Sequence, residues 1–390
     1  MIATGGYLAL SGLFLLMIGL YAREKRRHEA NLQAIALRIH VNGSRGKSSV
    51  TRLIAAGLRA GGHRAVAKTT GSAARIILAD GSEQPLRRRG LANIRELIAF
   101  VRLAAAGRAT AIVAECMAVR PELQRFAEAS LLKSQIGVIT NIRLDHEEVM
   151  GPGLVSIARA LANTIPAGGI LVTTAAAAAL LEATGLPGGT LVSVADDLSA
   201  ECLEGFEYAI FPENIALALA VCELAGVDRP TALAGMRQAE PDLGNVSLHT
   251  FPVAGKTVTL VNALAANDPE STRLLWQRYV EGSAAVLLNC RPDRKYRTTQ
   301  LAATFVAIHR GPYLVAGDCA FGRRQLVNCG VEPGAIRLLP PSPALADVLA
   351  AAGEVAGERL TLFAAGNVRG LDHLPIWRQT GATNQCTCSF

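Results

Sequence analysis

Short apolar runs alternate with longer amphipathic segments along most of this chain. Five runs rich in β-branched residues have the length of buried strands, at 35–41, 65–68, 110–115, 135–140 and 170–174. The segments between them have the apolar spacing of helices, at 49–60, 94–106, 121–132 and 154–165. This alternation predicts a mostly parallel, doubly wound α/β sheet, whose ligands gather at the carboxyl ends of the strands.

A polar, turn-rich stretch at 240–245 interrupts the alternation, and we interpret it as a linker between two domains. Four further strands are expected beyond it, at 257–261, 284–289, 312–316 and 360–365. The chain is therefore divided into a central domain at 30–240 and a smaller α/β domain at 246–380. Residues 381–390 are expected to form an unstructured tail.

The first 22 residues carry no charged side chain, and a basic cluster from Arg23 to Arg27 follows them directly. The apolar run is close to the roughly 20 residues that span a bilayer. Because the cations follow the run, a cleaved signal peptide is disfavoured. We expect residues 1–28 to form a single-pass membrane anchor, with the catalytic body in the cytoplasm. The alternative is a buried apolar helix of a soluble protein.

The most specific motif lies between the first strand and its helix. It consists of Gly43, Ser44, Arg45, Gly46, Lys47, Ser48 and Ser49. Glycines let backbone N–H groups turn toward anionic oxygens, and the following helix N-terminus adds positive charge. Lys47 can reach the outer phosphates, and the Ser48 hydroxyl can hold Mg²⁺. Val41 stands where the longer eight-residue pattern needs glycine, so this is a short G-x-x-G-K-S form that predicts ATP binding.

Polar side chains follow two other strands of the predicted sheet. Glu115 ends the third strand, and the next strand leads into Thr140-Asn141-Ile142-Arg143-Leu144-Asp145-His146. Placed near the phosphate loop, Ser48, Glu115 and His146 are candidate ligands for Mg²⁺, which prefers oxygen donors. Taken alone, Glu115 is more typical of a surface carboxylate, and His146 of a helix-capping or solvated histidine.

Composition excludes several classes of function. Aromatic residues make up only 5% of the 390 residues, and no basic stripe with interleaved aromatics accompanies the net charge of +7, so no nucleic-acid partner is expected. The eight cysteines form no C-x-x-C pair, which argues against a zinc site or a disulfide framework.

Together, these motifs resemble the Mur ligase superfamily over about residues 35–370. The resemblance is carried by the short phosphate loop, Thr69-Thr70-Gly71-Ser72, the glutamate after the third strand, T-N-x-x-x-D-H at 140–146, and Asn214 in an N-x-A-x-A helix start. Within the superfamily, the runs at 88–96 and 262–272, the apolar N-terminus and the lack of a nucleotide-sugar domain look like the ligase subunits of poly-γ-glutamate synthases.

That resemblance implies an ATP-dependent amide ligase that polymerises glutamate through γ-linkages. The reaction would pass through an acyl phosphate and release ADP and phosphate. Lys47, Asn141 and His146 would act on the transferring phosphoryl group, and Asn214 would face adenine. The second domain would add Asn262, Asn267, Asp268, Arg291 and Arg294 to the ATP site. Many Mur ligases hold a second metal with a carbamylated lysine, but no lysine lies between Lys133 and Lys256 here.

Arg88 and Arg89 are candidate ligands for the carboxylates of a γ-glutamyl chain, although a solvated charge run is the alternative. Glutamate, the growing chain and an integral-membrane subunit of a synthase complex are the expected partners, and a homo-oligomer is possible. Two other functions stay open: a membrane-tethered P-loop ATPase that drives a partner, and a folylpolyglutamate-type ligase.

Overall fold

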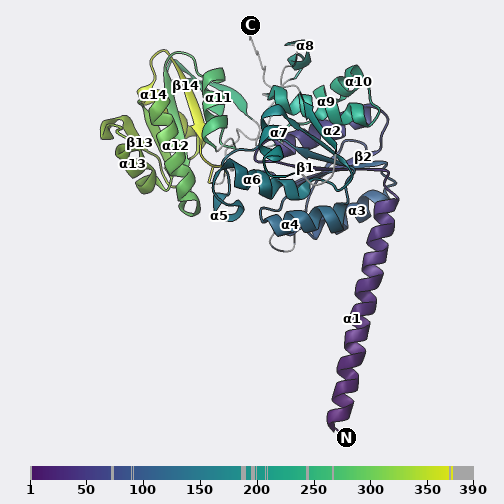
Figure 1. The fold of residues 1–390 in the computed structure, drawn as a ribbon. Helices are drawn as coiled ribbons and strands as arrows, with labels where there is room; N and C mark the ends of the chain where they lie inside the picture. The colour runs from purple at the N-terminus through teal and green to yellow at the C-terminus, as the bar shows by residue number, and fades with distance from the viewer. Residues whose placement is uncertain are drawn as a thin grey trace. The chain divides into compact units, whose positions relative to one another are not determined.

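A computed structural model describes residues 2–71, 74–88, 90, 92–185, 190–194, 198, 200–206, 208, 210–242, 246–265, 268–368 and 370–371. The chain forms two compact units (Figure 1). The first unit comprises Met1–Gly205 and Ile210–Glu240, and the second comprises Phe206–Ala209 and Pro241–Phe390. The expected site residues Arg89 and Asn267, and the expected tail at 381–390, lie outside the described residues.

The first unit is built on an eight-stranded sheet in the order β4-β3-β2-β5-β1-β6-β7-β8. Its strands are β1 (Leu37–Asn42), β2 (Ala65–Thr69), β3 (Arg75–Ile77), β4 (Glu83–Pro85), β5 (Ala111–Glu115), β6 (Ile136–Ile139), β7 (Ile170–Thr174) and β8 (Thr190–Val194). From β2 to β8 the neighbours run parallel, as the alternating pattern predicts. The antiparallel pair β3 and β4 was not expected, because its strands are short and partly polar.

Helices cover both faces of this sheet (Figure 1). They are α1 (Ile2–Gln33), α2 (Lys47–Ala60), α3 (Glu96–Ala106), α4 (Pro121–Phe126), the π-helix η1 (Ala127–Leu132), α5 (Glu147–Met150), α6 (Gly153–Leu161), the 3₁₀ helix η2 (Ala162–Thr164), α7 (Ala175–Glu182), α8 (Ala200–Leu203), α9 (Pro212–Leu224) and α10 (Arg229–Arg237). On one face α2 packs against α9 and α10. On the other, the last turn of α1, α3 and η1 bury a common apolar cluster.

The expectation of a membrane-spanning N-terminal anchor, and with it the expected membrane location, is wrong. In the part of the chain that the structure describes, no helix is long and apolar enough to cross a bilayer. The physical reason is that the apolar side chains that the structure describes in this helix run only from 12 to 22 before the basic cluster at Arg23, which is shorter than the roughly 20 residues that span a bilayer. The helix α1 instead continues to Gln33, and His28 and Leu32 near its end are buried in the first unit.

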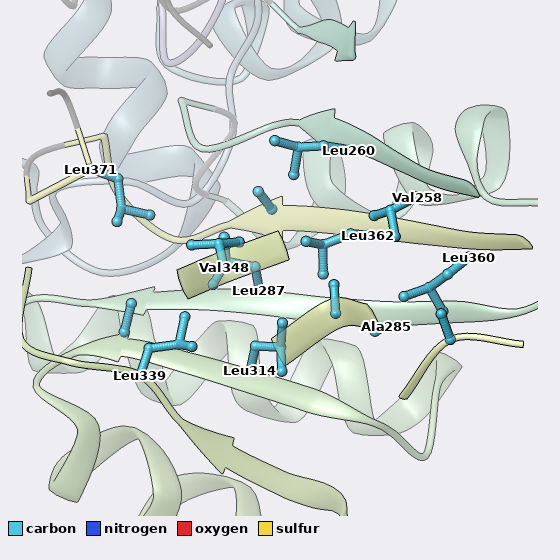
Figure 2. Close-up of a cluster of buried hydrophobic side chains, with 14 of the residues drawn as sticks. Val258, Leu260, Ala285, Leu287, Leu314, Leu339, Val348, Leu360, Leu362 and Leu371 are labelled. Atoms are coloured by element: carbon cyan, nitrogen blue, oxygen red, sulfur yellow. The ribbon is translucent and has the colours of Figure 1, made fainter. Parts of the chain in front are cut away.

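The second unit contains a six-stranded sheet in the order β13-β12-β11-β14-β10-β9. Its elements are β9 (Ser247–Val253), β10 (Lys256–Asn262), α11 (Pro269–Tyr279), β11 (Ala284–Cys290), η3 (Pro292–Arg294), α12 (Lys295–Ile308), β12 (Tyr313–Gly317), α13 (Cys319–Asn328), η4 (Pro333–Ala335), β13 (Ile336–Leu338), α14 (Leu345–Val355) and β14 (Arg359–Ala365). Only β9 is antiparallel to its neighbour among these paired strands. Figure 2 shows its apolar core, where Val258, Leu260, Leu287, Leu314, Val348 and Leu362 lie between strands and α14.

A charged pair is buried under the first sheet. His40 of β1 is fully buried, and its Nδ1 lies 2.8 Å from Oε2 of Glu128 in η1. Ser134 holds the same carboxylate through its backbone N–H at 2.8 Å and its hydroxyl at 2.9 Å. Burial alone would lower the pKa of His40, but the neighbouring Cys116 and Glu128 outweigh it and raise this pKa to about 10.

We expect this pair to make stability depend on pH. Between the unfolded pKa near 6.5 and the folded pKa near 10, His40 is protonated in the folded protein but not in the unfolded chain. The stabilisation that protonated His40 gives the fold is therefore complete below this pH range. It declines as the pH rises through the range, by up to about 1.4 kcal/mol per pH unit. The difference in unfolding free energy between wild type and His40→Gln should therefore shrink from pH 6.5 to 10 in urea titrations. His63→Gln, which lies outside the pair, should show the same dependence of unfolding free energy on pH as wild type. If His40→Gln also shows the wild-type dependence on pH, His40 is not the group whose protonation stabilises the fold.

Candidate nucleotide-binding and ligase site

The loop between β1 and α2 leaves the start of α2 open to an anion. The helix begins at Lys47, and no side chain caps its first turn. Gly46 precedes it in the left-handed region at φ +80°, and Gly43 opens the loop at φ +133°. Because the first N–H groups of a helix have no partner within the helix, this turn can donate to phosphate oxygens.

The loop is braced by the end of β6. The backbone N–H of Ser44 donates to the backbone carbonyl of Asn141 at 3.0 Å. The backbone N–H of Arg45 donates to the side-chain oxygen of Asn141, also at 3.0 Å. In return, the Asn141 amide at 3.1 Å and the Thr140 hydroxyl at 2.5 Å donate to the carbonyl of Arg45. A side chain at Gly43 would collide with Thr140, so only glycine fits there. Asn141, expected to act in catalysis, therefore also fixes the shape of the loop.

Two further contacts fasten the same segments together. The hydroxyl of Ser44 donates to the carbonyl of Arg143 at 3.0 Å and accepts from its backbone N–H at 2.9 Å. The guanidinium of Arg45 lies 3.2 Å from the carboxylate of Asp145. The two parts of the sequence motif, at 43–48 and 140–146, thus form one rigid structure at the carboxyl edge of the sheet.

Lys47 lies over the loop that precedes it. Its Nζ donates to the carbonyls of Gly43 at 2.7 Å and Ser44 at 3.4 Å. Burial lowers the pKa of Lys47, and the charge of Glu115 partly offsets this. The ammonium is therefore held inside the ring of backbone groups that would surround a bound phosphate.

Ser48 and Glu115 come together from α2 and β5. The Ser48 hydroxyl donates to Oε2 of Glu115 at 2.9 Å, and the backbone N–H of Thr70 donates to the same oxygen at 2.6 Å. Glu115 is 3% exposed. Hydroxyl and carboxylate oxygens suit Mg²⁺, which usually takes one or two protein ligands besides phosphate and water. No group of three or more His, Cys, Asp or Glu side chains that could hold a metal occurs among the described residues.

His146 is held by carboxylates of its own segment. Its Nδ1 lies 3.2 Å from Glu148, and its Nε2 lies 4.0 Å from Asp145. The residue has a left-handed backbone, at φ 53°, and directly precedes α5. Its position corresponds to the helix-cap alternative, although its side chain makes no capping hydrogen bond, and its expected metal and catalytic roles stay predictions.

Asn214 reaches the loop from a distant helix. It lies in the first turn of α9 behind Pro212 and is 6% exposed. A Cβ placed on Gly46 would lie only 2.7 Å from the Asn214 side-chain oxygen. The structure therefore puts Asn214 against the phosphate loop, while its expected contact with adenine stays a prediction.

The remaining expected residues are engaged within their own units. Arg88 forms an ion pair with Glu96, with Nε and Oε1 2.7 Å apart. In the second unit, Asn262 ends β10 and is 1% exposed, whereas Asp268 caps α11 by accepting from the N–H of Ser271 at 2.9 Å. Arg291 pairs with Asp293 at 2.6 Å, and Arg294 ends η3.

Two contributors to the site, and one buried lysine in the strand β2 beside it, were not singled out by the sequence analysis. Thr140 donates its hydroxyl to the carbonyl of Arg45, and Thr70 donates its backbone N–H to Glu115. Both residues belong to motifs that the sequence analysis quoted, but it gave neither of them a role in the site. Lys68 is fully buried in β2. A lysine inside an apolar strand is itself a signal, because lysine is rarely buried without a partner.

The sequence of this chain matches two known protein families. The sequence profile of the Mur ligase middle domain matches residues 41–185, and that of the poly-gamma-glutamate synthase CapB C-terminal domain matches residues 248–375. The capsule biosynthesis protein CapB of Bacillus anthracis is 39% identical over 314 residues, which cover 78% of this chain and 67% of that protein. The chain belongs to the CapB family. The PGA synthase CapB of Bacillus subtilis is 38% identical, covering 78% of each.

Solved structures of lower identity share the fold. Escherichia coli FolC in complex with ADP has a TM-score of 0.65 at 16% identity, covering 89% of this chain and 90% of that one. A folylpolyglutamate synthase/dihydrofolate synthase of Yersinia pestis, complexed with AMPPNP and a manganese ion, has a TM-score of 0.64 at 17% identity, covering 90% and 92%. The Mur-ligase-like α/β fold and the family membership expected from the motifs are thereby confirmed.

The contact between Gly46 and Asn214 generates a prediction. Gly46→Ala should weaken ATP binding at least tenfold, since the new methyl group meets Asn214 and the left-handed backbone adds about 1–2 kcal/mol of strain. Adding Asn214→Ala should recover part of the loss, measured by titration with a fluorescent ATP analogue.

Gly62→Ala is the matched control, because Gly62 has φ +85° with nothing within 4 Å of an added Cβ. It should lower the melting temperature but leave nucleotide affinity unchanged. If both glycine variants bind ATP equally well, the loop does not hold the nucleotide.

Proposed function

We propose that residues 43–48, Glu115 and Asn141 form the phosphoryl-transfer site of an ATP-dependent amide ligase that extends poly-γ-glutamate. The chain is a ligase of this class, as its CapB family membership and Mur-ligase-like fold indicate. The observation that carries the assignment of residues is the braced loop with an open helix start, beside a serine and a carboxylate that share a hydrogen bond. ATP, a divalent metal and glutamate are its substrates and cofactor.

The reaction follows two displacements. A carboxylate oxygen of the acid substrate attacks the γ-phosphorus of ATP, the bond to the bridging oxygen breaks, and ADP leaves. The amino group of an incoming glutamate then attacks the acyl carbon, loses a proton, and expels phosphate. The product is an amide, with one ADP and one phosphate released for each bond formed.

In this scheme, the residues of the loop bind and orient the triphosphate. Backbone N–H groups at the start of α2 would donate to phosphate oxygens, and Lys47 would exchange its bonds to Gly43 and Ser44 for the transferring phosphoryl group. Mg²⁺ bound by Ser48 and Glu115 would neutralise charge on the phosphates. Asn141 would keep the loop in place while the phosphoryl group moves.

A ligase of a charged polymer is expected to act with other subunits. A polyanion does not cross hydrocarbon unaided, so export of the product needs a separate protein path. The similarity to a capsule biosynthesis protein of Bacillus anthracis and a PGA synthase of Bacillus subtilis supports a polymer as the product. An integral-membrane subunit and a homo-oligomer stay predictions.

Trapping of the acyl phosphate tests the reaction type. With ATP, Mg²⁺, a γ-linked glutamate oligomer and hydroxylamine, wild type should form a hydroxamate, and Lys47→Met should form it at least 100-fold more slowly, because the buried ammonium is lost. Lys133→Met is the control, since Lys133 is 47% exposed and pairs with Glu29. ATP hydrolysis by wild type without any hydroxamate would instead favour a P-loop ATPase that drives a partner.

Metal dependence tests the role of Glu115. Glu115→Gln keeps the shape of the side chain but removes its charge, so the Mg²⁺ concentration for half-maximal rate should rise about tenfold or more. Glu122→Gln, an exposed residue in the first turn of α4, should behave as wild type. An unchanged Mg²⁺ requirement in Glu115→Gln would exclude Glu115 as a ligand.

A further inference from the structure

One buried cation of the first unit is not used by the phosphate loop. Lys68 lies in β2, on the face that carries Val66 and α3, and its side chain is completely shielded from solvent. Its Nζ lies 3.3 Å from Oε2 of Glu96 but makes no hydrogen bond of normal geometry to any described residue. An ammonium carries three donors, and leaving them unpaired in a protein interior is unfavourable. Such a group is expected to have a partner in some state of the protein.

The carboxylate that pairs with Lys68 is shared between two cations. Glu96 binds Arg88 in a bidentate manner, with Nε–Oε1 at 2.7 Å and Nη2–Oε2 at 3.3 Å, and it also faces Lys68. Burial would raise the pKa of Glu96, but the hydrogen bond from Arg88 and the charge of Lys68 lower it, so Glu96 is ionised. Two positive charges and one negative charge leave the cluster with a net charge of about +1, enough to attract a second carboxylate.

The cluster lies at the same edge of the sheet as the phosphoryl-transfer site. Lys68 is paired in register with Ala114, the residue before Glu115. Two residues after Lys68, the backbone N–H of Thr70 holds the Glu115 carboxylate. A carboxylate bound at Lys68 would therefore lie close to the proposed metal ligand but on the opposite face of the sheet from α2.

We propose that Lys68 and Arg88 bind a carboxylate of the acid substrate, and that Glu96 occupies the place of that carboxylate until the substrate arrives. This inference rests on the proposed function and names its substrate class, a γ-linked glutamyl chain with free α-carboxylates. The side chains of Arg88 and Glu96 are 29% and 14% exposed, so the ligand reaches the cluster from their side while Lys68 stays covered. Arginine suits this role because its planar guanidinium binds carboxylates bidentately.

Calorimetric titration of the full chain with γ-linked triglutamate, without ATP, tests the site. Lys68→Met replaces the ammonium with an apolar side chain of similar length, and binding should weaken at least tenfold while ATP affinity is unchanged. The melting temperature of the free variant should equal or exceed that of wild type, because a poorly paired buried charge is gone. A purely structural Lys68 would give a lower melting temperature and unchanged triglutamate affinity. Lys133→Met is again the matched control.

A second variant tests the exchange of carboxylates. Glu96→Gln removes the internal competitor but keeps its shape, so triglutamate should bind at least threefold more tightly than to wild type. Weaker binding in Glu96→Gln, wild-type binding in Lys68→Met, or no binding by wild type would overturn the inference. None of these results depends on hydroxamate formation, so a failure of this site is distinguishable from a failure of the proposed reaction.

Discussion

The phosphate loop keeps its shape because the end of β6 holds it from outside. Backbone conformations at Gly43 and Gly46 are strained for any other residue, and within the loop Lys47 holds only the carbonyls of Gly43 and Ser44 among the contacts described. Reciprocal hydrogen bonds with Thr140 and Asn141, together with Ser44 and Arg143, supply the missing constraint. The open start of α2, the position of Lys47 and the pairing of Ser48 with Glu115 all depend on this brace.

Parallel strand order explains why the polar groups meet. The chain returns from β1 through α2 to β2, yet β5 inserts between β1 and β2 in the sheet. Glu115 is thereby brought beside Val41, directly next to the loop, and its carboxylate is reached by Thr70 from the other neighbour. A site assembled in this way takes one functional group from each strand end, which gives precise placement on rigid elements.

Two ion pairs with a buried cation lie on the side of the sheet away from α2. His40 with Glu128 forms one pair, and Ser134 donates to the same carboxylate. Lys68 with Glu96 forms an incomplete one, because Glu96 is also bound by Arg88. The two clusters differ at the carboxylate: that of Glu128 accepts from His40 and Ser134, whereas that of Glu96 is shared between two cations, which leaves an excess of positive charge.

The sequence by itself determined the α/β alternation, the phosphate loop and the family. These features are local: β-branched runs set the strands, and the spacing of Gly43, Gly46, Lys47 and Ser48 encodes the turn. Sequence alone misjudged the N-terminal segment, where an apolar run of nearly sufficient length suggested a membrane span.

Only the tertiary structure decided which side chains from distant segments touch. Asn214 lies against Gly46 across 168 positions of sequence, and Glu96 lies between Lys68 and Arg88. The physical reason is that spacing along the chain fixes the turn at each strand end, whereas strand order and helix packing fix the neighbours of that turn.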